Sequence, residues 1–227
     1  YSLTNCTRTP FRFLFYFATD LTMNRARNRA RQRANRQLNG NSLHPPQLNA
    51  NVILKHRYRF ISTDGTATAI GAGDLLNAAG SLVVVANTTA RSLFKSVKIE
   101  EVEIWTPPAS QGSAATCSIL WSSSSAAAPT SLEVSDTTVS VAEPAHVRAR
   151  PPARSSPSFW MDVNSDSPFT ITAPSGSVID VTLTLVVLDG AAGGTWTIAS
   201  GTLGQVVYAP LDGDGDRFTP VSLTTAT

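Results

Sequence analysis

Residues 94–105 read FKSVKIEEVEIW, and this stretch decides the fold class. Apolar residues share one face of an extended chain on each side of the pair Glu100–Glu101: Val97 and Ile99 before it, Val102 and Ile104 after it. The pair itself shifts the alternation by one residue. A β-bulge at this point restores a single core face, so the sequence predicts a bulged, half-buried strand.

A second stretch, SVIDVTLTLVVL at 177–188, alternates without interruption, with Asp180, Thr182 and Thr184 on its polar face. The remaining strands, bounded by clusters of Gly, Pro, Ser and Asn, are predicted at 52–62, 81–87, 115–122, about 137–149, 158–163 and 168–173. A short helix fits 72–79, and residues 194–209 fit one or two further strands. Eight short strands with almost no helical period predict an all-β, antiparallel jelly-roll sandwich.

Charge is distributed very unevenly along the 227 residues. Residues 1–59 hold 11 Lys and Arg against one acid, a net charge of +10, and residues 60–227 hold 7 against 15 acids, a net charge of −8. This asymmetry indicates a basic arm that meets a polyanion. Only 15% of the chain is charged, against about 25% in ordinary soluble domains. Such a surface suits a protein covered by its neighbours, although a secreted or stalk-like β domain is an alternative.

Four zones follow from the composition. Residues 1–22 precede the first methionine, Met23, and are either upstream sequence or a true N-terminal segment. Residues 23–40, MNRARNRARQRANRQLNG, form an arginine-rich arm, and 41–51 form a linker whose two prolines stop any helix. Residues 52–227 form the jelly-roll domain with a C-terminal extension. No apolar run approaches the ~18 residues that span a membrane, so no membrane partner is expected.

The arm is the main candidate for a nucleic-acid contact. Its arginines fall on nearly every second residue: Arg25, Arg27, Arg29, Arg31, Arg33 and Arg36. Because the segment has no apolar stripe, we expect it to be disordered or extended when alone. Guanidinium groups bind phosphate, and without a surrounding fold they bind it without sequence preference. A nuclear-import signal and a solvated tail are the competing interpretations. Lys55, Arg57 and Arg59, which alternate on the predicted strand 52–62, extend the set of nucleic-acid-binding candidates.

The stretch LDGDGDRF at 211–218 is a candidate calcium loop. Asp212, Asp214 and Asp216 have the D-x-D-x-D spacing, but Arg217 replaces the turn glycine and no glutamate closes the loop. A solvated Asp-Gly turn is the alternative. The three histidines, His44, His56 and His146, form no metal-ligand spacing, and no nucleophile motif is present, so we expect no enzyme.

Taken together, the Arg-rich arm, the proline-containing linker and the body with FKSVKIEEVEIW and SVIDVTLTLVVLDG resemble the single jelly-roll capsid proteins of small icosahedral viruses. Circular single-stranded DNA viruses and satellite or tombus-like RNA viruses share this plan. The resemblance implies a homo-oligomeric shell of about 60 copies, with the arms facing a single-stranded genome, sometimes with structural calcium between subunits. It also implies a place in the virion, with assembly in the host nucleus or cytoplasm. The alternative is a cellular or phage β-sandwich that uses its basic tail to attach to nucleic acid or to an anionic surface.

Overall fold

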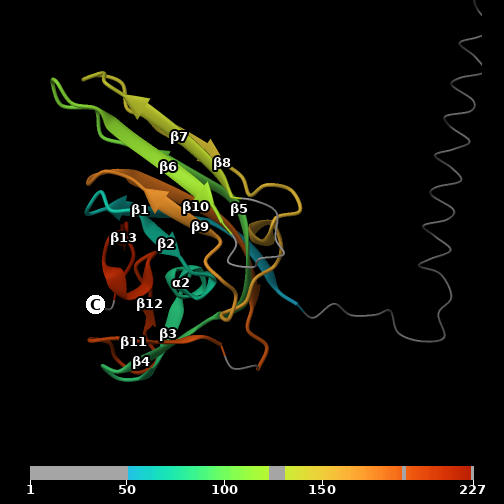
Figure 1. Cartoon of the computed structure of the whole chain (residues 1–227). Helices are drawn as coiled ribbons and strands as arrows, with labels where there is room; N and C mark the ends of the chain where they lie inside the picture. The colour runs from blue at the N-terminus through green and yellow to red at the C-terminus, as the bar shows by residue number, and fades with distance from the viewer. Residues whose placement is uncertain (1–50, 123–130, 191–192, 226–227) are drawn as a thin grey trace, which may run out of the picture. The chain divides into compact units, whose positions relative to one another are not determined.

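A computed structural model of the chain describes residues 51–122, 131–190 and 193–225, all within one compact unit (Figure 1). The predicted segment 1–22, the arm 23–40 and the linker up to residue 50 lie outside the described residues. The unit is built almost entirely from antiparallel strands. Within the described residues, no helix combines the length and apolar character needed to cross a membrane.

Two sheets form the body. The strands of the first, in order across the sheet, are β13 (Phe218–Pro220), β1 (Ile53–Ser62), β10 (Val178–Val187), β5 (Phe94–Trp105) and β8 (His146–Ala149). The strands of the second are β2 (Thr68–Ile70), β9 (Phe169–Thr172), β6 (Ala115–Trp121) and β7 (Leu132–Thr138). Every described pairing within these two sheets is antiparallel.

The strand order is that of a jelly roll. The orders β1-β10-β5-β8 and β2-β9-β6-β7 form two four-stranded sheets in which the chain passes repeatedly from one sheet to the other. Eight antiparallel strands wound in this way are the definition of the fold. The predicted fold class is therefore confirmed.

A smaller third sheet is added to the jelly roll. Its strands are β11 (Thr195–Thr197), β4 (Thr89–Ser92), β3 (Ser81–Val85) and β12 (Val206–Val207), and α2 (Ala72–Ala78) precedes it in the chain. Two short 3₁₀ helices, η1 (Ser156–Ser158) and η2 (Gly213–Gly215), lie in connecting segments. The helix at 72–79 and the two strands within 194–209 agree with the sequence prediction.

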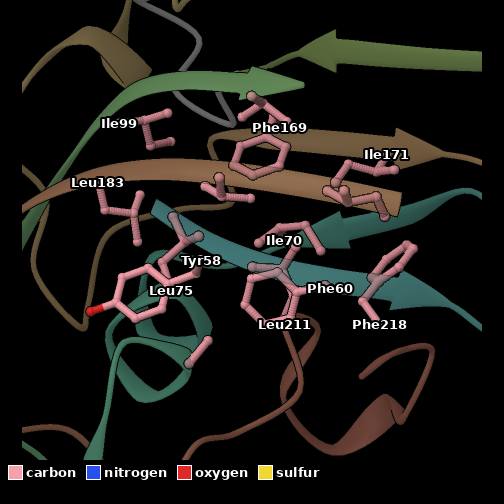
Figure 2. Packing of buried hydrophobic residues seen from close by; sticks show 14 of the residues in the cluster. Tyr58, Phe60, Ile70, Leu75, Ile99, Phe169, Ile171, Leu183, Leu211 and Phe218 are labelled. Atoms are coloured by element: carbon pink, nitrogen blue, oxygen red, sulfur yellow. The ribbon is translucent and has the colours of Figure 1, made fainter. Parts of the chain in front are cut away.

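The space between the two main sheets is filled with side chains. Aromatic residues from both sheets are almost completely buried: Phe60, Trp121, Phe169 and Phe218. Figure 2 shows Tyr58 and Phe60 of β1 pointing into the same cluster as Phe169 and Ile171 of β9. The Tyr58 hydroxyl donates a hydrogen bond to the carbonyl oxygen of Ala79 at 3.1 Å, which ties the core to the end of α2.

The predicted bulge is present in β5. In the pairing with β10, Ile99 lies opposite Leu183 and Glu101 lies opposite Thr182, so Glu100 has no partner of its own. As a result four apolar side chains, on both sides of the bulge, are buried in one core: Val97, Ile99, Val102 and Ile104. The extra residue is what keeps the core face continuous.

Two predicted strands were wrong. Residues 137–149 contain the end of β7, a loop around Pro144 and the strand β8, because the alternating valines of this range lie partly in the loop. Residues 158–163 form no strand, since η1 occupies its start and only Met161 forms a bridge, with Val97 of β5. The prolines before this segment and the exposure of Phe159 and Trp160 fit a connecting loop.

Candidate nucleic-acid interface

The predicted arm arginines, Arg25 to Arg36, lie outside the described residues, whereas Lys55, Arg57 and Arg59 lie on β1. Tyr58 and Phe60 alternate with them and are buried, so the three cations point to the outer face of the first sheet. This sheet face, turned away from the core, is where the nucleic-acid-binding candidates of the body meet.

Strand register places carboxylates beside these cations. Arg59 of β1 is opposite Asp180 of β10, Asp180 is opposite Glu103 of β5, and Glu103 is opposite Arg148 of β8. Cations thus occupy the two flanking strands, and acids occupy the two central strands. We refer to this set as the charged face and define it by these members: Lys55, Arg57, Arg59, Glu100, Glu101, Glu103, Arg148, Arg150 and Asp180.

Asp180 anchors the β1 side of the charged face. Its carboxylate accepts two hydrogen bonds from Arg59, from Nε at 2.7 Å and from Nη2 at 2.8 Å. Arg57 lies 3.6 Å away through Nη1 and also donates a hydrogen bond to Glu103, at 3.3 Å. The hydrogen bond that Arg59 donates to Asp180 raises the pKa of Arg59, which keeps this guanidinium charged.

Glu101 and Glu103 anchor the β8 side. Arg148 bridges them, with Nη2 2.8 Å from Glu101 and Nε 2.8 Å from Glu103. Arg150 donates from Nε to Glu101 at 2.9 Å. The hydrogen bond from Arg148 is the main cause that lowers the pKa of Glu101 to about 2, against the opposing effect of burial.

Cations and acids of the charged face differ sharply in exposure. The side chains of Arg57, Arg148 and Arg150 are 49%, 55% and 74% exposed, whereas those of Glu101 and Asp180 are 7% and 1% exposed. The cations of the charged face are therefore accessible to solvent, whereas these two acids are covered. A guanidinium has five N–H donors, and within the described residues Arg150 uses its Nε on a carboxylate. The charged face can thus accept an anion without breaking its own ion pairs.

A groove of about 440 Å³ runs over this surface. Glu100, Glu101 and Thr182 line it together with four cations. The cations are Lys55, Arg57, Arg148 and Arg150. Its polar, cationic lining suits a phosphate group better than an apolar ligand.

An aromatic pair continues the same face. Trp105 follows Glu103 on the outer side of β5 and is opposite His146, the first residue of β8. Their rings are stacked, with centroids 5.0 Å apart and planes 11° apart. Asp136 fixes the start of β8 by accepting the backbone N–H of His146 at 2.9 Å.

The sequence analysis missed Arg148, Arg150 and the Trp105–His146 pair as site residues. The signal was present, because HVRAR at 146–150 alternates cations as KHRYR at 55–59 does. The boundary error at 137–149 hid it.

The Asp cluster forms a tight turn around η2. The Asp212 carboxylate accepts the backbone N–H groups of Arg217 and Phe218, each at 3.3 Å, and Asp216 adopts a positive φ of 51°. The Asp214 side chain is outside the described part. Among the side chains that are described, no three acids, histidines or cysteines are grouped as metal ligands. The backbone hydrogen bonds at Asp212 account for the turn, and calcium binding by the predicted residues stays a proposal.

Comparison with known proteins gives distant likenesses among solved structures, including two to viral chains. A chain of Desmodium yellow mottle tymovirus is 14% identical, with a TM-score of 0.40 over 66% of this chain and 97% of that one. A chain from an expanded equine rhinitis A virus particle, described as a picornavirus capsid, is 9% identical, with a TM-score of 0.22 over 73% of this chain and 87% of that one. No protein-family model and no curated protein sequence matches the chain. The fold assignment rests on the strand order alone.

Proposed function

We propose that this chain is the shell protein of a small icosahedral virus, a structural and non-enzymatic role. It assembles with copies of itself, about 60 in the simplest closed icosahedral shell, and packages a single-stranded genome without sequence preference. The arm from Arg25 to Arg36 supplies the main contact, and Lys55, Arg57 and Arg59 extend it. The mature protein then resides in the virion, after assembly in the host nucleus or cytoplasm.

One observation carries the proposal: an eight-stranded jelly roll whose first strand, β1, follows an arginine-rich segment and a short linker. Jelly rolls occur in capsid, lectin and cupin proteins, so the fold alone does not assign a function. The arm distinguishes among them, since six arginines without an acid between residues 25 and 36 fit a polyanion.

The surface of the body also fits self-assembly. Large apolar side chains are exposed in several places, for example Phe159 at 58% and Trp160 at 47%. Neighbouring exposed apolar side chains, such as the adjacent Phe159 and Trp160, are candidates for a contact surface between proteins. In a shell, neighbouring copies cover them.

Negative-stain electron microscopy of the purified full chain tests the proposal. Uniform particles are the expected result. A monomer that persists at high concentration contradicts the shell and favours the alternative, a β-sandwich binding module with a basic tail. Deletion of residues 23–40 is the matched variant. It removes no described core residue, so we expect the body to fold. Without the arm, we expect the particles to be empty or irregular. Normal nucleic-acid content in those particles would show that the arm has another role.

A further inference from the structure

The β8 edge of the charged face combines two features that nucleic-acid surfaces use together. Arg148 and Arg150 point outward on alternate positions, and His146 precedes them on the same face. Single-stranded nucleic acid is bound by cations that follow its backbone and by aromatic rings on which bases stack. Both kinds of group lie here within five residues.

The guanidinium groups are held in place before any ligand arrives. Arg148 is fixed by two carboxylates at 2.8 Å each, and Arg150 by one at 2.9 Å. An oriented guanidinium loses less conformational entropy when it binds phosphate than a free side chain does. The buried acids therefore act as supports for the exposed cations.

The stacked pair offers a platform for a base. His146 is exposed, and Trp105 backs it at 5.0 Å with nearly parallel planes. A flat, supported ring at a sheet edge accepts an unpaired base, whereas the paired bases of a duplex are already stacked on one another. A platform of this kind favours single strands over duplexes.

Chain connectivity brings nucleic acid to this surface. The arm's last clustered arginine, Arg36, is 19 residues from Lys55, the first cation of the charged face (55 minus 36). A segment of that length reaches at most about 65 Å when fully extended. A strand held by the arm is therefore kept within reach of the body's own cations.

We propose that the β8 edge of the charged face is a second contact for single-stranded nucleic acid. Arg148 and Arg150 bind its phosphates, and a nucleobase stacks on the Trp105–His146 pair. The inference rests on the proposed function, because it assumes that the chain packages a genome. It adds a body site that reads the presence of unpaired bases, which the arm does not.

The test uses the full chain with its arm intact and two polymers, a single-stranded oligonucleotide and inorganic polyphosphate of similar charge. His146→Ala removes an exposed ring, and we expect it to weaken oligonucleotide binding about five-fold or more. Polyphosphate has phosphates without bases, so its affinity should not change. Arg148→Ala with Arg150→Ala should weaken both ligands and flatten the salt slope by about 1.4.

Arg91→Ala with Arg154→Ala is the matched control, because these exposed arginines lie off the charged face. Thermal unfolding of each variant checks the fold, and Arg148→Lys with Arg150→Lys keeps the charge if the alanine pair does not fold. The inference is overturned if the His146 variant and the Arg148 and Arg150 variants bind like the control pair while deletion of the arm still abolishes packaging. That result leaves the proposed function standing. The inference is also overturned if these variants bind normally but no longer assemble, which assigns the surface to a second copy. If the wild-type chain binds no nucleic acid, both proposals are overturned.

Discussion

Arg59 and Asp180 are 121 residues apart in sequence and form a two-point ion pair across adjacent strands, at 2.7 and 2.8 Å. The aspartate is buried and the arginine is half exposed. The pair therefore joins the beginning of the body to its last jelly-roll strand. Arg59 is the nearer of two arginines that neutralise the buried carboxylate, with Arg57 at 3.6 Å as the second.

Arg59→Ala should lower the free energy of unfolding by about 1–2 kcal/mol, a charge-assisted hydrogen bond discounted for the exposure of Arg59. Arg150→Ala is the matched change, because Glu101 keeps Arg148 at 2.8 Å after it, whereas Asp180 keeps Arg57 at the longer distance of 3.6 Å after Arg59→Ala. We expect it to cost less than about 0.5 kcal/mol. Urea unfolding of both variants measures the difference, and equal losses would contradict the anchoring role of Asp180.

The pH dependence of stability should reflect Glu101. Its pKa is about 2 in the folded protein against an ordinary value of 4.5, so the folded state favours the charged form. The resulting stability is fully present above about pH 4.5 and is lost as pH falls toward 2. Glu101→Gln should flatten the decline of the melting temperature across this window. Glu133→Gln, an exposed change on β7, should leave the slope as in wild type.

Deletion of Glu100 should be tolerated, because the remaining residues of β5 alternate without a bulge. The losses are a 3.8 Å ion pair with Lys55 and a 3.0 Å hydrogen bond from Thr184, together about 1 kcal/mol. Deletion of Lys98 instead turns Val97 out of the core, and we expect no folded protein. Circular dichroism and thermal melting compare the two. A folded Lys98 deletion with unchanged stability would show that the bulge does not set the register.

Calcium should have little effect on stability if the turn at Asp212 is held by its own backbone hydrogen bonds. We expect EDTA and Asp214→Asn to leave the melting temperature unchanged. Asp212→Ala should lower stability by about 1 kcal/mol, because the N–H groups of Arg217 and Phe218 lose their acceptor. A rise in melting temperature with added calcium that disappears in Asp214→Asn would instead establish a metal site.

An isolated peptide of residues 23–40 should bind single-stranded oligonucleotides through charge alone. With five or six phosphate contacts, log affinity against log salt should have a slope of roughly −3.5 to −4. Replacing two of the arginines with alanine should flatten it by about 1.4. Fluorescence anisotropy over a salt series measures this. Strong preference for one sequence at fixed salt would be incompatible with phosphate binding by the arm.

Strong local patterns in the sequence predicted most of the fold. The bulge at Glu100 was predictable because two apolar alternations meet there out of phase, and β10 was predictable because its alternation is unbroken. β7 was misplaced because both faces of LEVSDTT are largely exposed, which leaves no apolar period to detect. Phe159 and Trp160 led to the opposite error. Their apolar side chains predict a strand, although both residues are exposed and lie in a connecting segment.

The sequence predicted only part of the charged face. Lys55, Arg57 and Arg59 show their alternation in sequence, but their carboxylate partners come from β5 and β10, far along the chain. Only the register of three strand pairs reveals that Arg148 and Arg150 complete the set. Sequence spacing does not carry that information.

The place of β1 between β10 and β13 has a consequence for synthesis on the ribosome. After Ser62 is made, 115 more residues (177 minus 62) must follow before β10 begins at Val178. At about 5–20 residues per second, this takes roughly 6–23 seconds. Throughout that time the arm has already been synthesised, while the first strand has no neighbour to pair with. The arm is therefore complete before the body has a finished surface to offer to another copy of itself.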